Sequence, residues 1–134
     1  MRKDKPHDPT RMAQDAARRI QAHDYQAAPR LLDRALAMDP DRHRALDARA
    51  LLLARTGKEP EALELYRRII ATHATDSVAY FNLAGLHQRS GRLKEALSAL
   101  EQLFTRTSPQ GEASATARPL AYALCRDIQE ARAA

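Results

Sequence analysis

An all-α fold is the fold class that this sequence predicts, and three observations predict it. Only 4% of the 134 residues are aromatic and only 4 are glycine, whereas β-sandwiches and barrels need β-branched and aromatic residues and many turn glycines. Apolar residues, 44% of the chain, recur mostly at helical spacing. The same short pattern also returns at a fixed interval along the chain, which is typical of stacked helical hairpins.

The repeat is clearest at two glycine turns. The third residue of both 55–63 and 89–97 is glycine, and both segments end in Glu-Ala-Leu, at an offset of 34 residues. A further step of 34 residues from Ala62 toward the N-terminus reaches Ala28. Three copies therefore span 9–42, 43–76 and 77–110. Their apolar stripes predict two helices per copy, which should bury their apolar faces only by stacking on a neighbour. The predicted helices are 9–22, 25–38, 43–55, 59–72, 77–89 and 93–106.

A 34-residue helix-turn-helix unit with these residues resembles the tetratricopeptide repeat family, over about three quarters of the chain. The third copy matches the family pattern at Tyr80, Leu83, Ala84, His87, Ala96 and Leu100. The resemblance implies a right-handed solenoid of three helical hairpins, in which the first helix of each hairpin lines a concave groove.

The first copy departs most from the family pattern. Asp15 stands where the family has leucine, and the second copy has Arg49 at the same position. Pro29 falls inside the predicted helix 25–38, where a proline removes a backbone donor and costs up to about 3 kcal/mol. We therefore expect this helix either to start late or to kink.

The C-terminal segment, 111–134, is predicted to be a linker followed by a capping helix. Turn-forming residues extend to Ser114, after which Leu120, Leu124 and Ile128 recur at helical spacing. Such a helix would cover the apolar end of the stack, with Cys125 as a small buried hydrophobe on it. Two alternatives are that it opens a fourth repeat of a longer protein or packs against a second chain by self-association.

At the N-terminal end of the chain, residues 1–8 are predicted to be a disordered basic tail.

Composition and motifs argue against several functional classes. The net charge is only +5 because acids and bases alternate along the chain, so nucleic-acid binding is not expected. The histidines show no metal-ligand pair at i, i+4, and no P-loop or second cysteine is present. We therefore expect no enzyme activity, no cofactor and no metal. The single cysteine indicates a cytoplasmic protein, and no membrane segment is expected.

The resemblance implies a non-enzymatic protein-interaction module, acting as an adaptor, scaffold or co-chaperone-like protein that binds an extended, acidic peptide. Carried over by repeat position, the peptide-binding residues of the concave face are Gln14, Gln21, Arg44, Asp47, Leu51, Arg55, Val78, Phe81, Asn82, Gln88 and Arg89. Of the positions that clamp a C-terminal carboxylate in the best-known members, only Asn82 is retained, so a chaperone-tail clamp is not expected.

Two alternatives stay open. The same residues also fit plain solvated helix faces, with Arg55 and Arg89 as cations at helix C-termini. The chain could also be an accessory repeat domain or fragment of a larger enzyme, such as a transferase, that presents substrate to a separate catalytic domain.

Overall fold

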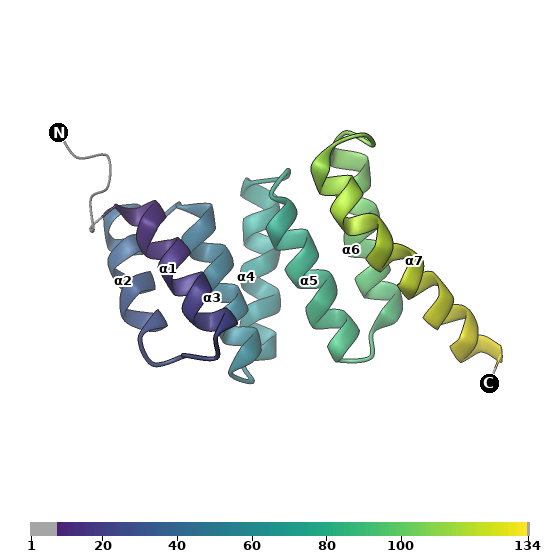
Figure 1. Cartoon of the computed structure of the whole chain (residues 1–134), viewed down its shortest axis with the longest axis horizontal. Helices are drawn as coiled ribbons and strands as arrows, with labels where there is room; N and C mark the ends of the chain where they lie inside the picture. The colour runs from purple at the N-terminus through teal and green to yellow at the C-terminus, as the bar shows by residue number, and fades with distance from the viewer. Residues whose placement is uncertain (1–7, 134) are drawn as a thin grey trace. The chain divides into compact units, whose positions relative to one another are not determined.

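The computed structural model describes residues 8–133 of the 134, and in this range it contains seven helices and no strand (Figure 1). The predicted all-α fold class is confirmed. The predicted basic tail lies outside the described residues, apart from Asp8. The helices are α1 (Pro9–Gln21), α2 (Ala28–Met38), α3 (His43–Arg55), α4 (Glu59–Thr72), α5 (Ser77–Arg89), α6 (Leu93–Arg106) and α7 (Glu112–Ala133).

Two helices begin at an aspartate that accepts hydrogen bonds from the first backbone amides. Asp8 accepts a bond from the amide of Thr10 at 3.0 Å, before α1. Asp76 accepts bonds from the amides of Val78 and Ala79 at 3.1 and 3.3 Å, before α5. Because these amides have no partner inside the helix, a short acidic side chain at this position determines where the helix starts.

Helix α2 begins at Ala28, whereas the sequence predicts a start at residue 25. Pro29 explains the difference, because it lies in the first turn of the observed helix. An amide in the first turn has no partner within the helix, so a proline costs nothing there, while its fixed φ suits the helix. The late start is the first of the two outcomes expected for Pro29.

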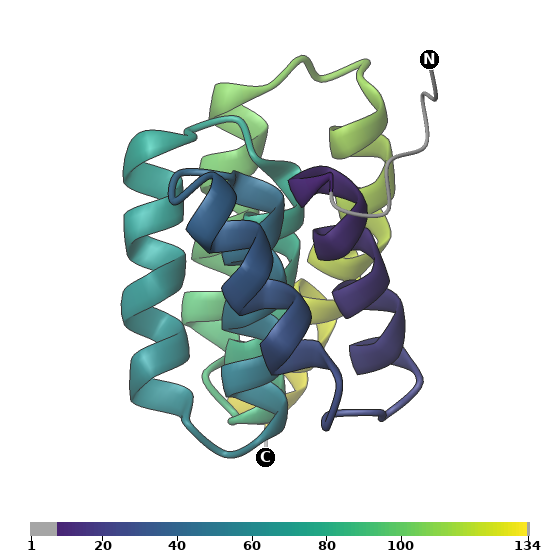
Figure 2. The same ribbon diagram turned by 90° about the vertical axis from the view of Figure 1, so that its left-hand side faces the viewer.

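The chain divides into two compact units, residues 1–69 and 70–134, and the boundary lies inside α4. In unit 1, α1 packs against both α2 and α3, and α2 also contacts α3 (Figure 2). Arg49 of α3 forms an ion pair with Asp33 of α2. The buried cluster consists of Met12, Ala13, Ala16, Ile20, Ala28, Leu32, Ala35, Ala45, Ala48 and Leu51.

In unit 2, α5 packs against α6 and α6 packs against α7. The buried cluster consists of Tyr80, Ala84, Ala96, Ala99, Leu100, Leu103, Ala117, Ala121 and Leu124. The Tyr80 hydroxyl donates to the carbonyl of Ala74 at 2.8 Å and accepts from Arg106 at 2.6 Å. These bonds satisfy the polar end of a fully buried ring.

Helix α7 is longer than the sequence predicts, because it begins at Glu112 and includes residues that look like a linker. Ser114 is buried in its first turn, and its hydroxyl donates to the carbonyl of Ser108 at 2.9 Å. This bond ties the helix to the preceding turn. Pro119 lies inside the helix, so the carbonyl of Ala115 lacks its usual amide donor there.

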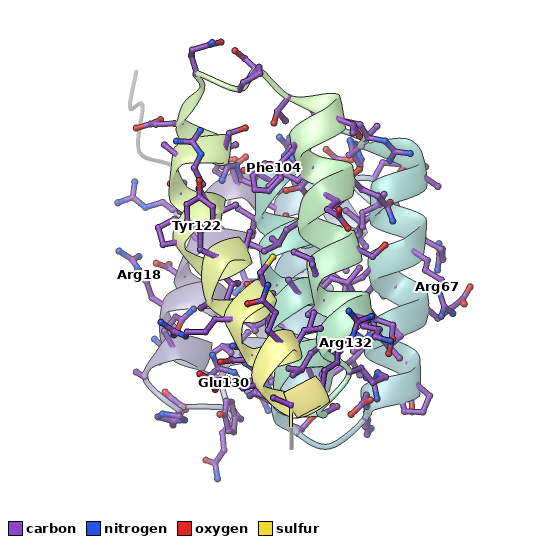
Figure 3. The ribbon with its side chains drawn as sticks, turned by 90° about the vertical axis from the view of Figure 1, so that its right-hand side faces the viewer. Arg18, Arg67, Phe104, Tyr122, Glu130 and Arg132 are labelled. Atoms are coloured by element: carbon purple, nitrogen blue, oxygen red, sulfur yellow. The ribbon has the colours of Figure 1, made fainter. Side chains whose placement is uncertain are left out.

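The outer face of α7 differs from the prediction at Cys125. Cys125 is exposed, so its prediction as a buried hydrophobe is wrong. The buried residues of α7 are Ser114, Ala117, Ala121 and Leu124. Cys125 follows Ala121 by four residues, so the helical period places it at the edge of this stripe, where the packing of α7 leaves it exposed. Tyr122 is also on the outside, at 69% exposure, where Figure 3 shows its ring beside the helix.

Candidate functional site

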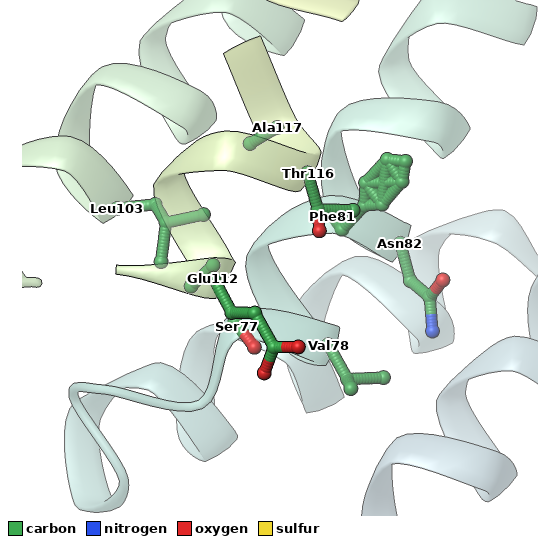
Figure 4. Close-up of a pocket in the computed structure, with 9 residues that line it drawn as sticks. Ser77, Val78, Phe81, Asn82, Leu103, Glu112, Thr116 and Ala117 are labelled. Carbon is green, nitrogen blue, oxygen red and sulfur yellow. The ribbon is translucent and has the colours of Figure 1, made fainter. Parts of the chain in front are cut away.

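A pocket of about 380 Å³ lies within unit 2 (Figure 4). Helix α5 contributes four lining residues, α6 contributes one and α7 contributes four. The lining residues are Ser77, Val78, Phe81, Asn82, Leu103, Glu112, Ala113, Thr116 and Ala117. The volume is within the range of about 300 to 1,000 Å³ that is usual for ligand sites.

Helical spacing brings the α5 and α7 residues to the pocket. Ser77, Val78, Phe81 and Asn82 follow one another at steps of one, three and one residues on α5, and Glu112, Ala113, Thr116 and Ala117 do the same on α7. Residues at this spacing share one face of a helix. Two equivalent helical faces therefore form most of the pocket.

The pocket combines apolar and polar surfaces. Leu103 and Ala117 are each 1% exposed, so they are part of the core as well as of the pocket wall. Val78 is 44% exposed, which makes it one of the three most accessible large apolar residues in the described part of the chain. The polar lining groups are the hydroxyls of Ser77 and Thr116, the Asn82 amide and the Glu112 carboxylate. An amide and hydroxyls beside an apolar wall suit a peptide, whose backbone is polar and whose side chains can be apolar.

Three of the eleven residues assigned from the sequence meet in this pocket: Val78, Phe81 and Asn82. Gln88 is half-buried and Arg89 exposed in the last turn of the same helix. The Nη1 atom of Arg89 would lie 3.6 Å from a Cβ added to Gly85, so the guanidinium extends back along α5.

The other six assigned residues belong to unit 1. Gln14 and Gln21 are exposed on α1, Arg44 is exposed on α3 and Arg55 is half-buried at its end. Asp47 and Leu51 are buried on α3, at 5% and 6% exposure. The side chains of Asp47 and Leu51 are therefore not available to a ligand in this structure.

The arginines among the predicted peptide-binding residues differ from several other arginines of the chain in their ion pairs. Among the described residues, Arg44, Arg55 and Arg89 form no ion pair, whereas Arg18, Arg19 and Arg49 each pair with an aspartate. These three cations can therefore interact with solvent or with a ligand.

Sequence reasoning missed the residues that α6 and α7 contribute to the pocket. A signal was present, because Glu112 and Thr116 stand one repeat period after Val78 and Asn82. The repeat period therefore continues into the first half of α7. The turn-forming residues before Ser114 conceal it, since they predict a linker instead of a helix.

Two further observations concern metal binding and membrane crossing. Within residues 8–133, no three His, Cys, Asp or Glu side chains are grouped so that they could hold a metal ion. In the same range, no helix has the length and apolar character needed to cross a membrane.

Comparison with known families agrees with the repeat seen in the sequence. One family model described as tetratricopeptide repeat matches residues 16–77, and a second with the same description matches residues 53–115. No curated protein matches the chain. The two matched segments overlap and together extend from the middle of α1 to the first turn of α7. With its paired helices and its 34-residue period, the chain belongs to the tetratricopeptide repeat family.

Proposed function

We propose that this protein is a non-enzymatic adaptor that binds an extended segment of a partner protein, with the unit 2 pocket as its main contact. Tetratricopeptide repeats are in general protein–protein interaction modules. The observation that carries the proposal is the pocket itself, which joins Val78, Phe81 and Asn82 of α5 to the first half of α7. A cytoplasmic location remains a prediction from the single cysteine.

The chemistry of the pocket supports an extended peptide as the ligand. The Asn82 amide can donate to a backbone carbonyl and accept from a backbone amide, and one peptide unit offers both groups. Phe81 and Val78 provide apolar surface for a side chain of the same segment. An extended chain is suitable because it exposes its backbone groups and its side chains together.

We also propose that acidic residues of the partner interact with arginines outside the pocket. Arg44, Arg55 and Arg89 make no ion pair among the described residues, and the repeat register gives Arg55 and Arg89 equivalent positions on α3 and α5. Arg44 and Arg89 are exposed and Arg55 is half-buried. Cations at the surface favour the approach of an acidic segment and add little affinity individually.

An array of peptides tests this function. We expect wild-type protein to bind a subset of peptides, and Asn82→Ala to weaken that binding by about two- to tenfold, the effect of one net hydrogen bond. Phe81→Ala should weaken it as well, because apolar contact in the pocket is lost. Arg44→Glu and Arg89→Glu should reduce the share of acidic sequences among the bound peptides.

Gln102→Ala is the matched control, because Gln102 is exposed on α6 and does not line the pocket. It should bind like the wild type. The proposal is wrong if no peptide is retained, or if the Asn82 and Phe81 variants bind as the control does.

A further inference from the structure

We infer that the unit 2 pocket takes an apolar side chain that has a lysine or arginine next to it in the partner peptide, and that Glu112 recognises this cation. The inference rests on the proposed function and defines its specificity. It also gives α7 a second role, because the helix that covers the end of the core would then carry the determinant of selectivity.

The size and lining of the pocket indicate the apolar part of the ligand. About 380 Å³ is enough for one or two side chains and too little for a folded element. Leu103, Ala113 and Ala117 line it together with Val78 and Phe81, so most of its wall is apolar. An apolar side chain would be favourable here in proportion to the apolar surface that it removes from water.

The charge of the pocket indicates the rest of the ligand. Glu112 is the one ionisable residue among those that line it, and it is exposed in the first turn of α7. Among the described residues, Glu112 forms no ion pair. In Figure 4 its carboxylate lies near Ser77 and Val78, at the edge of the lining residues. A cation beside the bound side chain would therefore find a carboxylate without a competing partner.

The partial positive charges of the helix N-termini at the pocket are offset by carboxylates. Both α5 and α7 begin there, and each helix N-terminus carries the equivalent of about half a positive charge. At α5, however, the Asp76 carboxylate already accepts from the amides of Val78 and Ala79. Its second oxygen, Oδ2, is buried and has no partner among the described residues. The Asp76 and Glu112 carboxylates thus each stand at the start of one of these helices and offset its partial positive charge.

A structural role for Glu112 is the competing explanation. An acidic residue in the first turn of a helix interacts favourably with the helix dipole, whether or not a ligand binds. The two explanations differ in what the neutral variant Glu112→Gln changes. A structural role lowers thermal stability and leaves the ranking of peptides unchanged, whereas a recognition role changes that ranking.

The experiment uses full-length protein and peptides that the array retains in an Asn82-dependent manner. Alanine scanning first identifies the apolar residue that each peptide requires. Its neighbour is then made lysine, glutamine or glutamate, with both peptide ends blocked so that no terminal charge contributes. We expect the lysine peptide to bind the wild type about two- to fivefold more tightly than the glutamine peptide, the range for an exposed ion pair, and the glutamate peptide to bind most weakly.

Glu112→Gln should abolish the preference for lysine. Glu130→Gln is the matched control on the same helix, because Glu130 is exposed and does not line the pocket; it should keep the preference. The preference should also shrink as salt is raised. Melting curves of both variants show whether any loss reflects stability.

The outcomes separate this inference from the proposed function. If peptides bind through Asn82 but show no preference for lysine, or keep that preference in Glu112→Gln, the role of Glu112 is overturned and the proposed function stands. If no peptide binds in an Asn82-dependent manner, the proposed function fails and the inference fails with it.

Discussion

Single residues set the turn between the helices of each hairpin. His23, Gly57 and Gly91 stand one repeat period apart and all have positive φ, of 62°, 83° and 78°. A left-handed conformation is natural for glycine and costs other residues about 1 to 2 kcal/mol, with histidine among those found there more often than most. His23 also lies 3.0 Å from the Tyr25 hydroxyl through its Nδ1 atom. The first hairpin thus makes the same turn as the others without glycine.

Gly57→Ala tests the backbone requirement of the turn. A Cβ added at Gly57 would meet no atom within 4 Å, so the expected loss of about 1 kcal/mol comes from the conformation and not from a clash. Gly57→Asn should lose less, because asparagine tolerates this region better than alanine. Urea unfolding measures both. Equal stability of the alanine variant and the wild type would mean that the turn does not require a left-handed residue.

At the scale of helices, small residues allow the two helices of a hairpin to pack closely. Ala28, Ala62 and Ala96 occupy equivalent repeat positions on α2, α4 and α6, and all three are fully buried.

The two prolines Pro29 and Pro119 affect their helices in different ways. Pro29 lies in the first turn of α2, where it sets the start, whereas Pro119 lies inside α7 and interrupts its backbone hydrogen bonds.

Ala62→Leu and Ala96→Leu should each destabilise the protein by roughly 1 to 3 kcal/mol, because a close-packed core has no space for the added methyl groups. Ala71→Leu is the control, since Ala71 is exposed on α4, the helix that carries Ala62. It should change stability by less than about 0.5 kcal/mol. If the melts of the two core variants match that of the control, these alanines are not packing positions.

At the scale of the whole chain, the structure consists of two compact units with a core each, and α7 completes the second one. Ala117, Ala121 and Leu124 of α7 belong to the same buried cluster as Leu100 and Leu103 of α6. In a repeat protein each hairpin contacts only its neighbours, so a last helix has to cover the apolar face that would otherwise be open. The same helix supplies one side of the pocket.

Ending the chain at Gln110 removes α7 and should expose Leu100 and Leu103 of α6. We expect a lower melting temperature and association or aggregation, because a contiguous apolar patch is then open to solvent. Size-exclusion chromatography and thermal melting of the shortened and full-length chains measure this. A shortened chain that stays monomeric and melts at the same temperature would exclude a covering role for α7.

The sequence by itself determined the repeat and most of the helices. The bounds of α3, α4, α5 and α6 are as predicted, because each is delimited by local signals, namely apolar spacing and the residues of the turns. The resemblance to the tetratricopeptide repeat family placed Val78, Phe81 and Asn82 on the binding face, and the pocket contains all three.

The tertiary structure alone decided which faces are covered. It buries Asp47 and Leu51, exposes Cys125, and joins Glu112 and Thr116 to the α5 face in one pocket. Helical periodicity states which residues share a face, but burial depends on which neighbouring helix packs against that face, and this follows from contacts between residues far apart in the sequence. For α7, packing against α6 and the bond from Ser114 to Ser108 favour a helix where local composition favours a turn.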